Sequence, residues 1–298
     1  MKQRTSYNQL PFALTPLGLI LASCGGGGSS SGGSGQSVSQ DPPGFGGGGG
    51  FSPFDVGGNV VKGPLSNALV FLDYDDDGVQ DAGEPSIRTD ANGGYTITSS
   101  NSNYSVVAVA DETTIDTSSG TVLTGVTLKA PKGASVITPT TTLMKESNLS
   151  ADEVSTVLSL PDGVDLLTFN PYGSGVDAAK ALAVEKVSQQ VMSVVNSFAA
   201  AAEGAGASAD DAFKASMKSF VEVIKTKSAS SNKQIDLTDS TDLGLMKTQI
   251  TSEVAKVSGV NTTAFNSLST STTTAIKNVN DKIKTVSDLS SDSSKNVF

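Results

Sequence analysis

The hydrophobic pattern of this chain changes its period near Thr138, and that change constrains the fold more than any other feature. Before it, short runs rich in Val, Ile, Thr and Tyr are separated by turn residues such as those of DANGG (90–94). After Gly175, apolar residues recur at every third or fourth position. We therefore expect a multi-domain fold with both α and β parts, an antiparallel β-sandwich over residues 58–138 followed by an all-α helical bundle over residues 139–287.

Start signals and apolar stripes support the helical half. Ser150 to Glu153 and Ser208 to Asp211 have the spacing of capping boxes, which predicts that a helix begins at each. Four apolar stripes begin at Val176, Phe213, Leu243 and Phe265. We interpret these stripes as the core of the bundle, with a groove for a partner helix as the alternative. The polar residues 288–298 are expected to form a frayed tail.

Composition excludes several kinds of chemistry. The 298 residues include no histidine, no tryptophan and one cysteine, and the formal net charge is −10. A nucleophile paired with histidine, a zinc site built on histidine and a disulfide within the chain are therefore excluded. The acidic balance argues against binding to nucleic acid, which requires clustered Lys and Arg.

The N-terminus, MKQRTSYNQLPFALTPLGLILASC, has the features of an export signal. Lys2 and Arg4 precede an apolar run, Leu10 to Leu21, that is too short to span a bilayer. The run ends in LASC, which resembles the lipobox of bacterial lipoproteins. The resemblance implies that residues 1–23 are a signal peptide that is removed and that Cys24 carries the lipid. An ordinary secretory signal with a chance cysteine is the alternative.

Residues 24–57 follow as a stretch dominated by Gly and Ser, and we expect a flexible tether. Gly25 stands where an Asp would resemble a signal for retention in the inner membrane. We therefore expect a lipid anchor in the bacterial cell envelope, in the outer membrane or at the cell surface.

The stretch DYDDDGVQDAGE (73–84) has the spacing of a complete calcium loop. Alternate oxygen ligands wrap one hard cation, a glycine allows the sharp turn, and a glutamate closes the cage. Asp76 lies between ligand positions and is expected to face solvent. The alternative is a solvated acidic turn without a cation. The predicted calcium ligands are Asp73, Asp75, Asp77, the backbone carbonyl of Val79, Asp81 and Glu84.

The segments on either side of this loop differ from those of an EF-hand, because a strand-like NALVFL enters it and PSIRT leaves it. This combination resembles the B-type (SD-repeat) sandwich modules of bacterial surface proteins and the related collagen-adhesin B and carboxypeptidase-regulatory folds. The resemblance implies a calcium-stiffened module on a cell surface. Those repeats often form an isopeptide bond through a Lys of the first strand. Lys62 stands in a comparable place, but the sequence indicates no Asn and acid partner, so no bond is assigned.

We expect a non-enzymatic, membrane-anchored, surface-displayed lipoprotein that acts in adhesion, scaffolding or capture of a protein or glycan ligand. One alternative is a periplasm-facing assembly factor whose bundle binds a partner protein. Another is a glycan-acting enzyme that uses carboxylates alone, with Glu153, Asp165 or Glu185 as candidates. Those three acids occupy positions typical of helix caps or solvent-facing surfaces, and aromatic platforms for sugars are scarce, so an enzyme is disfavoured.

Overall fold

A computed structural model describes residues 52–289 and residue 297 of the chain. The expected signal peptide, Cys24, most of the expected tether and most of the expected tail lie outside the described residues. The described residues belong to one compact unit. Among the described residues, no helix combines the length and apolarity needed to cross a membrane.

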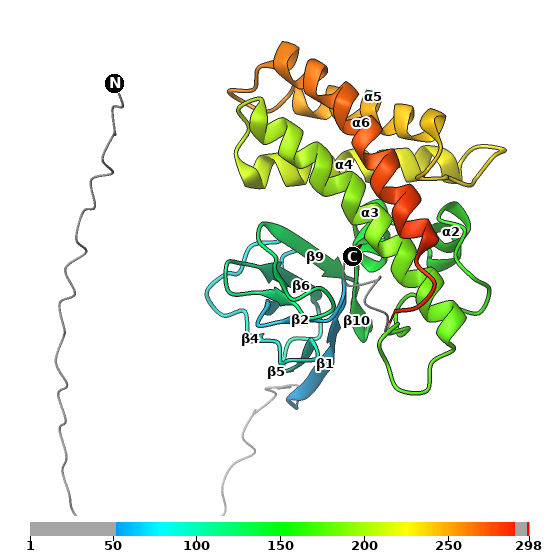
Figure 1. The fold of residues 1–298 in the computed structure, drawn as a ribbon. Coiled ribbons are helices and arrows are strands. Elements are labelled where there is room, and N and C mark those ends of the chain that lie inside the picture. Colours follow the sequence, from blue (N-terminus) through cyan, green and yellow to red (C-terminus); the bar gives the residue numbers. More distant parts are fainter. Residues whose placement is uncertain (1–51, 290–296, 298) are drawn as a thin grey trace, which may run out of the picture. The chain divides into compact units, whose positions relative to one another are not determined.

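The first part of this unit consists of short strands, as the sequence predicts (Figure 1). Val, Ile and Thr are frequent in the longer strands because β-branched side chains suit a half-buried pleated surface. The strands are β1 (Phe54–Val60), β2 (Leu65–Ser66), β3 (Leu69–Asp73), β4 (Ser86–Arg88), β5 (Gly94–Ser99), β6 (Ser105–Ala110), β7 (Ile115–Asp116), β8 (Thr121–Val122), β9 (Val126–Ala130) and β10 (Val136–Ile137).

The strands form three sheets, with the orders β10-β1-β5, β2-β7-β8 and β4-β3-β6-β9. All neighbouring strands are antiparallel except β1 and β10, which run parallel in the register Asn59↔Val136. That parallel pair joins the two ends of the strand-rich part. A mostly antiparallel first part is therefore confirmed, and one parallel pair was not foreseen.

β1 begins at Phe54, inside the segment expected to be tether. It pairs with β5 in the register Phe54↔Ser99, and the side chain of Val56 is buried. The ring of Phe54 stacks on that of Tyr104 with 6.2 Å between centroids. The end of the Gly-rich stretch is therefore a paired strand, and the side chains of Val56 and Phe54 pack against the rest of the protein.

Within the described residues, six helices follow, and the second part of the unit is helical as expected. Ser150 and Ser208 are N-cap residues, as the capping boxes predict. Among the four long helices, α3 packs against α4 and α6, and α5 packs against the same two. The helices are α1 (Pro139–Ser147), α2 (Ala151–Val157), α3 (Ala178–Gly204), α4 (Ala209–Ser228), α5 (Ser240–Val254) and α6 (Thr262–Thr285).

One hydrophobic core runs through both the strand-rich and the helical part. Leu72 of β3 and Phe198 of α3 are among its fully buried side chains, and burial of a side chain of this size contributes roughly 1.5–3 kcal/mol. α1 lies along β9, where Lys129 N–H donates to Thr142 Oγ1 at 2.9 Å and Thr141 Oγ1 donates to the Lys129 carbonyl at 3.0 Å. α1 therefore satisfies backbone groups at the edge of a sheet, and the two parts meet there.

Candidate calcium-binding loop

The acidic loop lies between two paired strands. β3 ends at Asp73 and β4 begins at Ser86, and the two strands pair in the register Phe71↔Ser86. Asp73 and Glu84, the first and last predicted ligands, are both buried at the base of the loop. The strands thus fix the two ends of the loop, while its middle residues are exposed.

Asp73 organises the first half of the loop. Its Oδ1 accepts a hydrogen bond from Asp76 N–H at 2.6 Å, and its Oδ2 accepts one from Gly78 N–H at 2.9 Å. Gly78 has a φ of 78°, a left-handed conformation that glycine adopts without steric cost. The glycine predicted at the sharp turn is therefore where the backbone needs it.

Glu84 organises the second half. Its Oε1 accepts a hydrogen bond from Tyr74 N–H at 2.6 Å, and its Oε2 accepts one from Asp81 N–H at 2.9 Å. Asp77 Oδ1 accepts a hydrogen bond from Val79 N–H at 2.7 Å. Backbone donors therefore hold three carboxylates in place before any cation is considered, and each carboxylate oxygen keeps a second lone pair.

The five predicted carboxylate ligands come together as two overlapping groups. Asp73, Asp75 and Glu84 form one group, and Asp75, Asp77 and Asp81 form the other. Within each group, one oxygen per residue lies within 4.8 Å of the others. Val79 lies between Asp77 and Asp81 in the chain with an exposed side chain. Asp75, the residue common to both groups, is therefore the carboxylate most central to the loop.

The loop concentrates negative charge. The pKa of Asp81 is raised, mainly by the charge of Asp77, with smaller contributions from burial and from the other acids of the loop. A divalent cation among these oxygens would remove that repulsion. Crowded carboxylates occur in cation sites and also in acidic turns without a cation. The geometry and the charge of these residues together define the candidate site.

The side chain of Asp76 is exposed, as expected, but it also has partners within the protein that the sequence did not indicate. Its carboxylate pairs with Lys145 of α1 at 2.7 Å and accepts a hydrogen bond from Ser105 Oγ at 2.9 Å. Although partial burial alone would raise its pKa, these hydrogen bonds and the charge of Lys145 hold the pKa of Asp76 below its usual value. The loop is thereby tied to the first helix.

A buried charged cluster was missed by the sequence interpretation. Lys62 pairs with Asp116 of β7 at 3.3 Å, and both side chains are buried. Glu185 of α3 is fully buried as well; its Oε1 accepts hydrogen bonds from Gly63 N–H at 2.9 Å and from Gln189 Nε2 at 2.7 Å. Burial raises the pKa of the Glu185 carboxyl.

The interpretation of Glu185 as a cap or solvent-facing acid is therefore wrong, because the turn after β1 covers it. Glu153 does close the capping box with Ser150, and Asp165 accepts hydrogen bonds from Leu167 N–H and Thr168 Oγ1. The acid near Lys62 that the sequence did not indicate is Asp116. It belongs to a two-residue strand with no pattern of its own.

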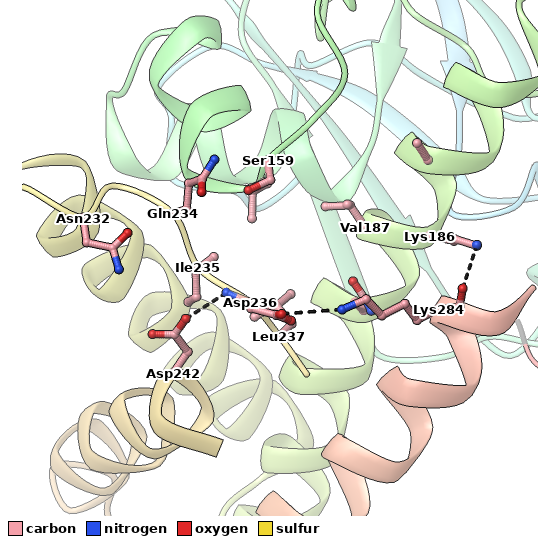
Figure 2. A pocket seen from close by; sticks show the side chains of 13 residues that line it. Ser159, Lys186, Val187, Asn232, Gln234, Ile235, Asp236, Leu237, Asp242 and Lys284 are labelled. Carbon is pink, nitrogen blue, oxygen red and sulfur yellow. Dashed lines mark hydrogen bonds and ion pairs between the residues drawn. The ribbon is translucent and has the colours of Figure 1, made fainter. Parts of the chain in front are cut away.

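A cleft of about 490 Å³ lies elsewhere, between α3, the α4–α5 connection and the end of α6 (Figure 2). Figure 2 shows its charged side chains turned toward neighbouring protein groups. Asp242 Oδ2 accepts from Asp236 N–H at 2.8 Å, Lys284 lies 3.5 Å from the Asp236 carboxylate, and Lys186 donates to the Lys284 carbonyl at 2.9 Å. These charged groups hold the α4–α5 connection and the end of α6 together. This structural role explains why they lie in the cleft.

Comparison with protein-family models, with curated proteins and with solved structures found no match. The resemblance to lipoproteins and to B-type surface modules therefore stands on the motifs of this sequence alone.

Proposed function

We propose that this chain is a calcium-binding, non-enzymatic lipoprotein of a bacterial cell envelope, anchored through Cys24 and displayed on the tether of residues 24–57. In this proposal the strand-rich part is a β-sandwich of the B type, and the helical part is a bundle that acts in adhesion, scaffolding or capture of a protein or glycan ligand. The observation that carries the proposal is the meeting of five carboxylates at Asp75, in the order and spacing of a calcium loop.

Calcium is favoured over magnesium by the number and kind of ligands. Calcium accepts six to eight oxygens in flexible geometry, whereas magnesium requires a near-ideal octahedron and keeps several waters. Five carboxylates and one backbone carbonyl supply many protein oxygens. Backbone hydrogen bonds to Asp73 and Glu84 already set the loop, which reduces the ordering that a cation must impose.

The role proposed for the ion is structural. The loop joins β3 to β4 and is paired with α1 through Asp76 and Lys145. A bound cation would therefore stabilise the loop and, through this ion pair, the place where the sheets meet the first helix. The helices of an EF-hand, which open in calcium sensors, have no counterpart beside this loop.

A catalytic role is not proposed. Glu153 and Asp165 accept hydrogen bonds within their own short segments, and Glu185 is buried beneath the turn after β1. Hydrogen bonds from protein groups thus occupy all three acids considered for glycan chemistry, and these bonds account for their positions.

A partner-binding role for the helical part is the second candidate. Leu268 and Val279 of α6 are both more than a third exposed, and their spacing places them on one face of that helix. Leu245 of α5 is exposed as well. In this candidate, a surface that includes these side chains contacts a partner protein, for display outside the cell or for assembly in the periplasm.

Thermal melting of the full chain tests the structural role of the ion. We expect the melting temperature to be higher in calcium than in EDTA, because a ligand that binds only the folded state stabilises it. Asp75→Asn should abolish this difference without removing any of the loop hydrogen bonds described above. Glu112→Gln, at an exposed acid outside the loop, should leave it unchanged. An equal melting temperature in calcium and EDTA for the unmodified chain contradicts the proposal.

The anchor requires a separate experiment. Cells that express the chain are labelled with radioactive palmitate, with Cys24→Ser as the control, and intact cells are treated with protease. Label that depends on Cys24 supports the lipid anchor, and digestion in intact cells supports display at the surface. Protection from protease until the outer membrane is opened would favour the periplasmic alternative.

A further inference from the structure

A second cleft, of about 670 Å³, opens directly beside the calcium loop, between the four-stranded sheet and α4. Its sheet wall is apolar, with Leu69, Phe71 and Val109, and α4 contributes Phe213 and Met217 from the opposite side. Clefts of this volume with mostly apolar walls and a few polar groups are typical of small-molecule sites. Three lysines and three acids also line the cleft, around this apolar wall.

Three lysines line the same cleft, from β9 and α4. Lys129 pairs with Glu146 at 2.8 Å, and Lys214 pairs with Asp210 at 2.8 Å on the exposed surface of α4. Lys129 is half-buried and stays with Glu146. The Lys214 pair is exposed and contributes little to stability, so Lys214 can turn toward another anion at small cost.

Lys218 is the lysine best placed to do so. It lies 3.0 Å from Glu253, whose carboxylate is nearly buried and also pairs with Lys256 at 2.6 Å. When Lys218 moves to an anion in the cleft, Glu253 keeps a cation. No buried carboxylate is therefore left unpaired by the exchange.

The calcium loop forms the remaining wall, with Asp77, Gly78 and Val79. Asp77 and Val79 are also predicted cation ligands. Lys129 lies against the loop, since a Cβ added at Gly78 would meet Lys129 Nζ at 2.9 Å. The negative charge of the loop therefore contributes to the electrostatic potential in the cleft. A cation bound in the loop would make that potential less negative.

We propose that this cleft binds a small amphipathic molecule with an apolar body and one anionic group, and that calcium in the loop strengthens the binding. The apolar body lies against the sheet and α4, and the anionic group lies at Lys218. The calcium dependence rests on the proposed calcium site, whereas the cleft itself does not. Because coupling between two binding equilibria is reciprocal, the occupied cleft also strengthens calcium binding by the same factor.

Two fluorescent probes test the proposal with the full chain. 1-Anilinonaphthalene-8-sulfonate has an apolar body and one anionic group, and N-phenyl-1-naphthylamine is the same body without the sulfonate. We expect both to bind at one site per chain. The sulfonate should bind more tightly in calcium than in EDTA, by on the order of threefold or more, and the neutral probe should show no such difference.

Matched variants locate the site. Val109→Trp fills the apolar wall and should abolish binding of both probes, whereas Val122→Trp places the same side chain at an exposed position outside the cleft and should have no effect. Thr127→Trp, on the neighbouring strand of the same wall, serves if the first variant does not fold. Lys218→Gln should weaken binding of the sulfonate several-fold and leave binding of the neutral probe unchanged.

Binding of the probes that is unaffected by the filling variants would overturn the proposed cleft. Equal affinity of the sulfonate in calcium and EDTA, in a chain that calorimetry shows to bind calcium, would overturn the coupling alone. A chain that binds no calcium but loses the probes on Val109→Trp would refute the proposed calcium function and leave the cleft standing.

Discussion

Replacement of Glu185 by Gln should make the protein more resistant to unfolding as the pH rises. Glu185 is fully buried, and burial raises the pKa of its carboxyl, with a further contribution from the charge of Asp116. Hydrogen bonds from Gln189 and Gly63 and the charge of Lys62 act in the opposite direction without reversing the shift. The Tyr172 hydroxyl also lies beside the Glu185 carboxyl, and burial followed by the charge of Glu185 raises the pKa of Tyr172.

The direction of this pH dependence follows from the protonation of Glu185 in the folded and in the unfolded chain. Below the ordinary pKa of a glutamate, both folded and unfolded chains carry the protonated acid, and the full stability is present. Above it, the unfolded chain releases the proton while the folded chain retains it, so the free energy of unfolding falls by about 1.4 kcal/mol per pH unit until the raised pKa of the folded state is passed. Glu185→Gln keeps Oε1 as the acceptor for Gly63 and Gln189 and removes this dependence.

Urea unfolding of both chains at several pH values between about 5 and 8 measures the effect. The difference in free energy of unfolding should increase with pH in favour of the variant. Glu203→Gln, at an exposed position of the same helix, is the control and should show no comparable increase. A difference that stays constant with pH, or a variant that becomes less stable as the pH rises, would refute the placement of a protonated acid under the turn after β1.

Two further substitutions test packing and backbone. Phe198→Ala, at a fully buried position of α3, should lower the free energy of unfolding by about 3–5 kcal/mol in denaturant titrations, and a loss below about 1 kcal/mol would show that this side chain is not in the core. Gly63 has a φ of 67°, and a Cβ there would clash with Asp116, whereas Gly120 has a φ of 73° with open space around it. Gly63→Ala should therefore destabilise the chain by more than the roughly 1–2 kcal/mol expected for Gly120→Ala from conformation alone, and equal losses would contradict the close contact between the turn and Asp116.

The local features of the fold could be predicted from the sequence. The period of the apolar residues and the capping boxes at Ser150 and Ser208 determine where helices begin, because the physics that governs them acts within one or two turns. The spacing of the calcium loop likewise predicts that Asp73 and Glu84 are the first and last residues of one loop, and both lie at its base. Both of these signals are contained within a dozen neighbouring residues.

Features that join distant segments could not be predicted in this way. The parallel pairing of β1 with β10 depends on two strands from opposite ends of the strand-rich part, and β10 has only two residues. The buried cluster brings Lys62, Asp116 and Glu185 together from a turn, a short strand and a helix. Since each residue alone has the surroundings of an ordinary surface charge, only the tertiary structure shows that they meet.

Calorimetric titration of the full chain with calcium examines the proposed site most directly. The proposal predicts one calcium ion per chain, an affinity at least tenfold weaker in Asp75→Asn, and an unchanged affinity in Glu112→Gln. Calcium that releases or absorbs no heat, in a chain whose melting temperature is also the same in calcium and in EDTA, would contradict it. The stretch from Asp73 to Glu84 would then be an acidic turn held by its own backbone hydrogen bonds.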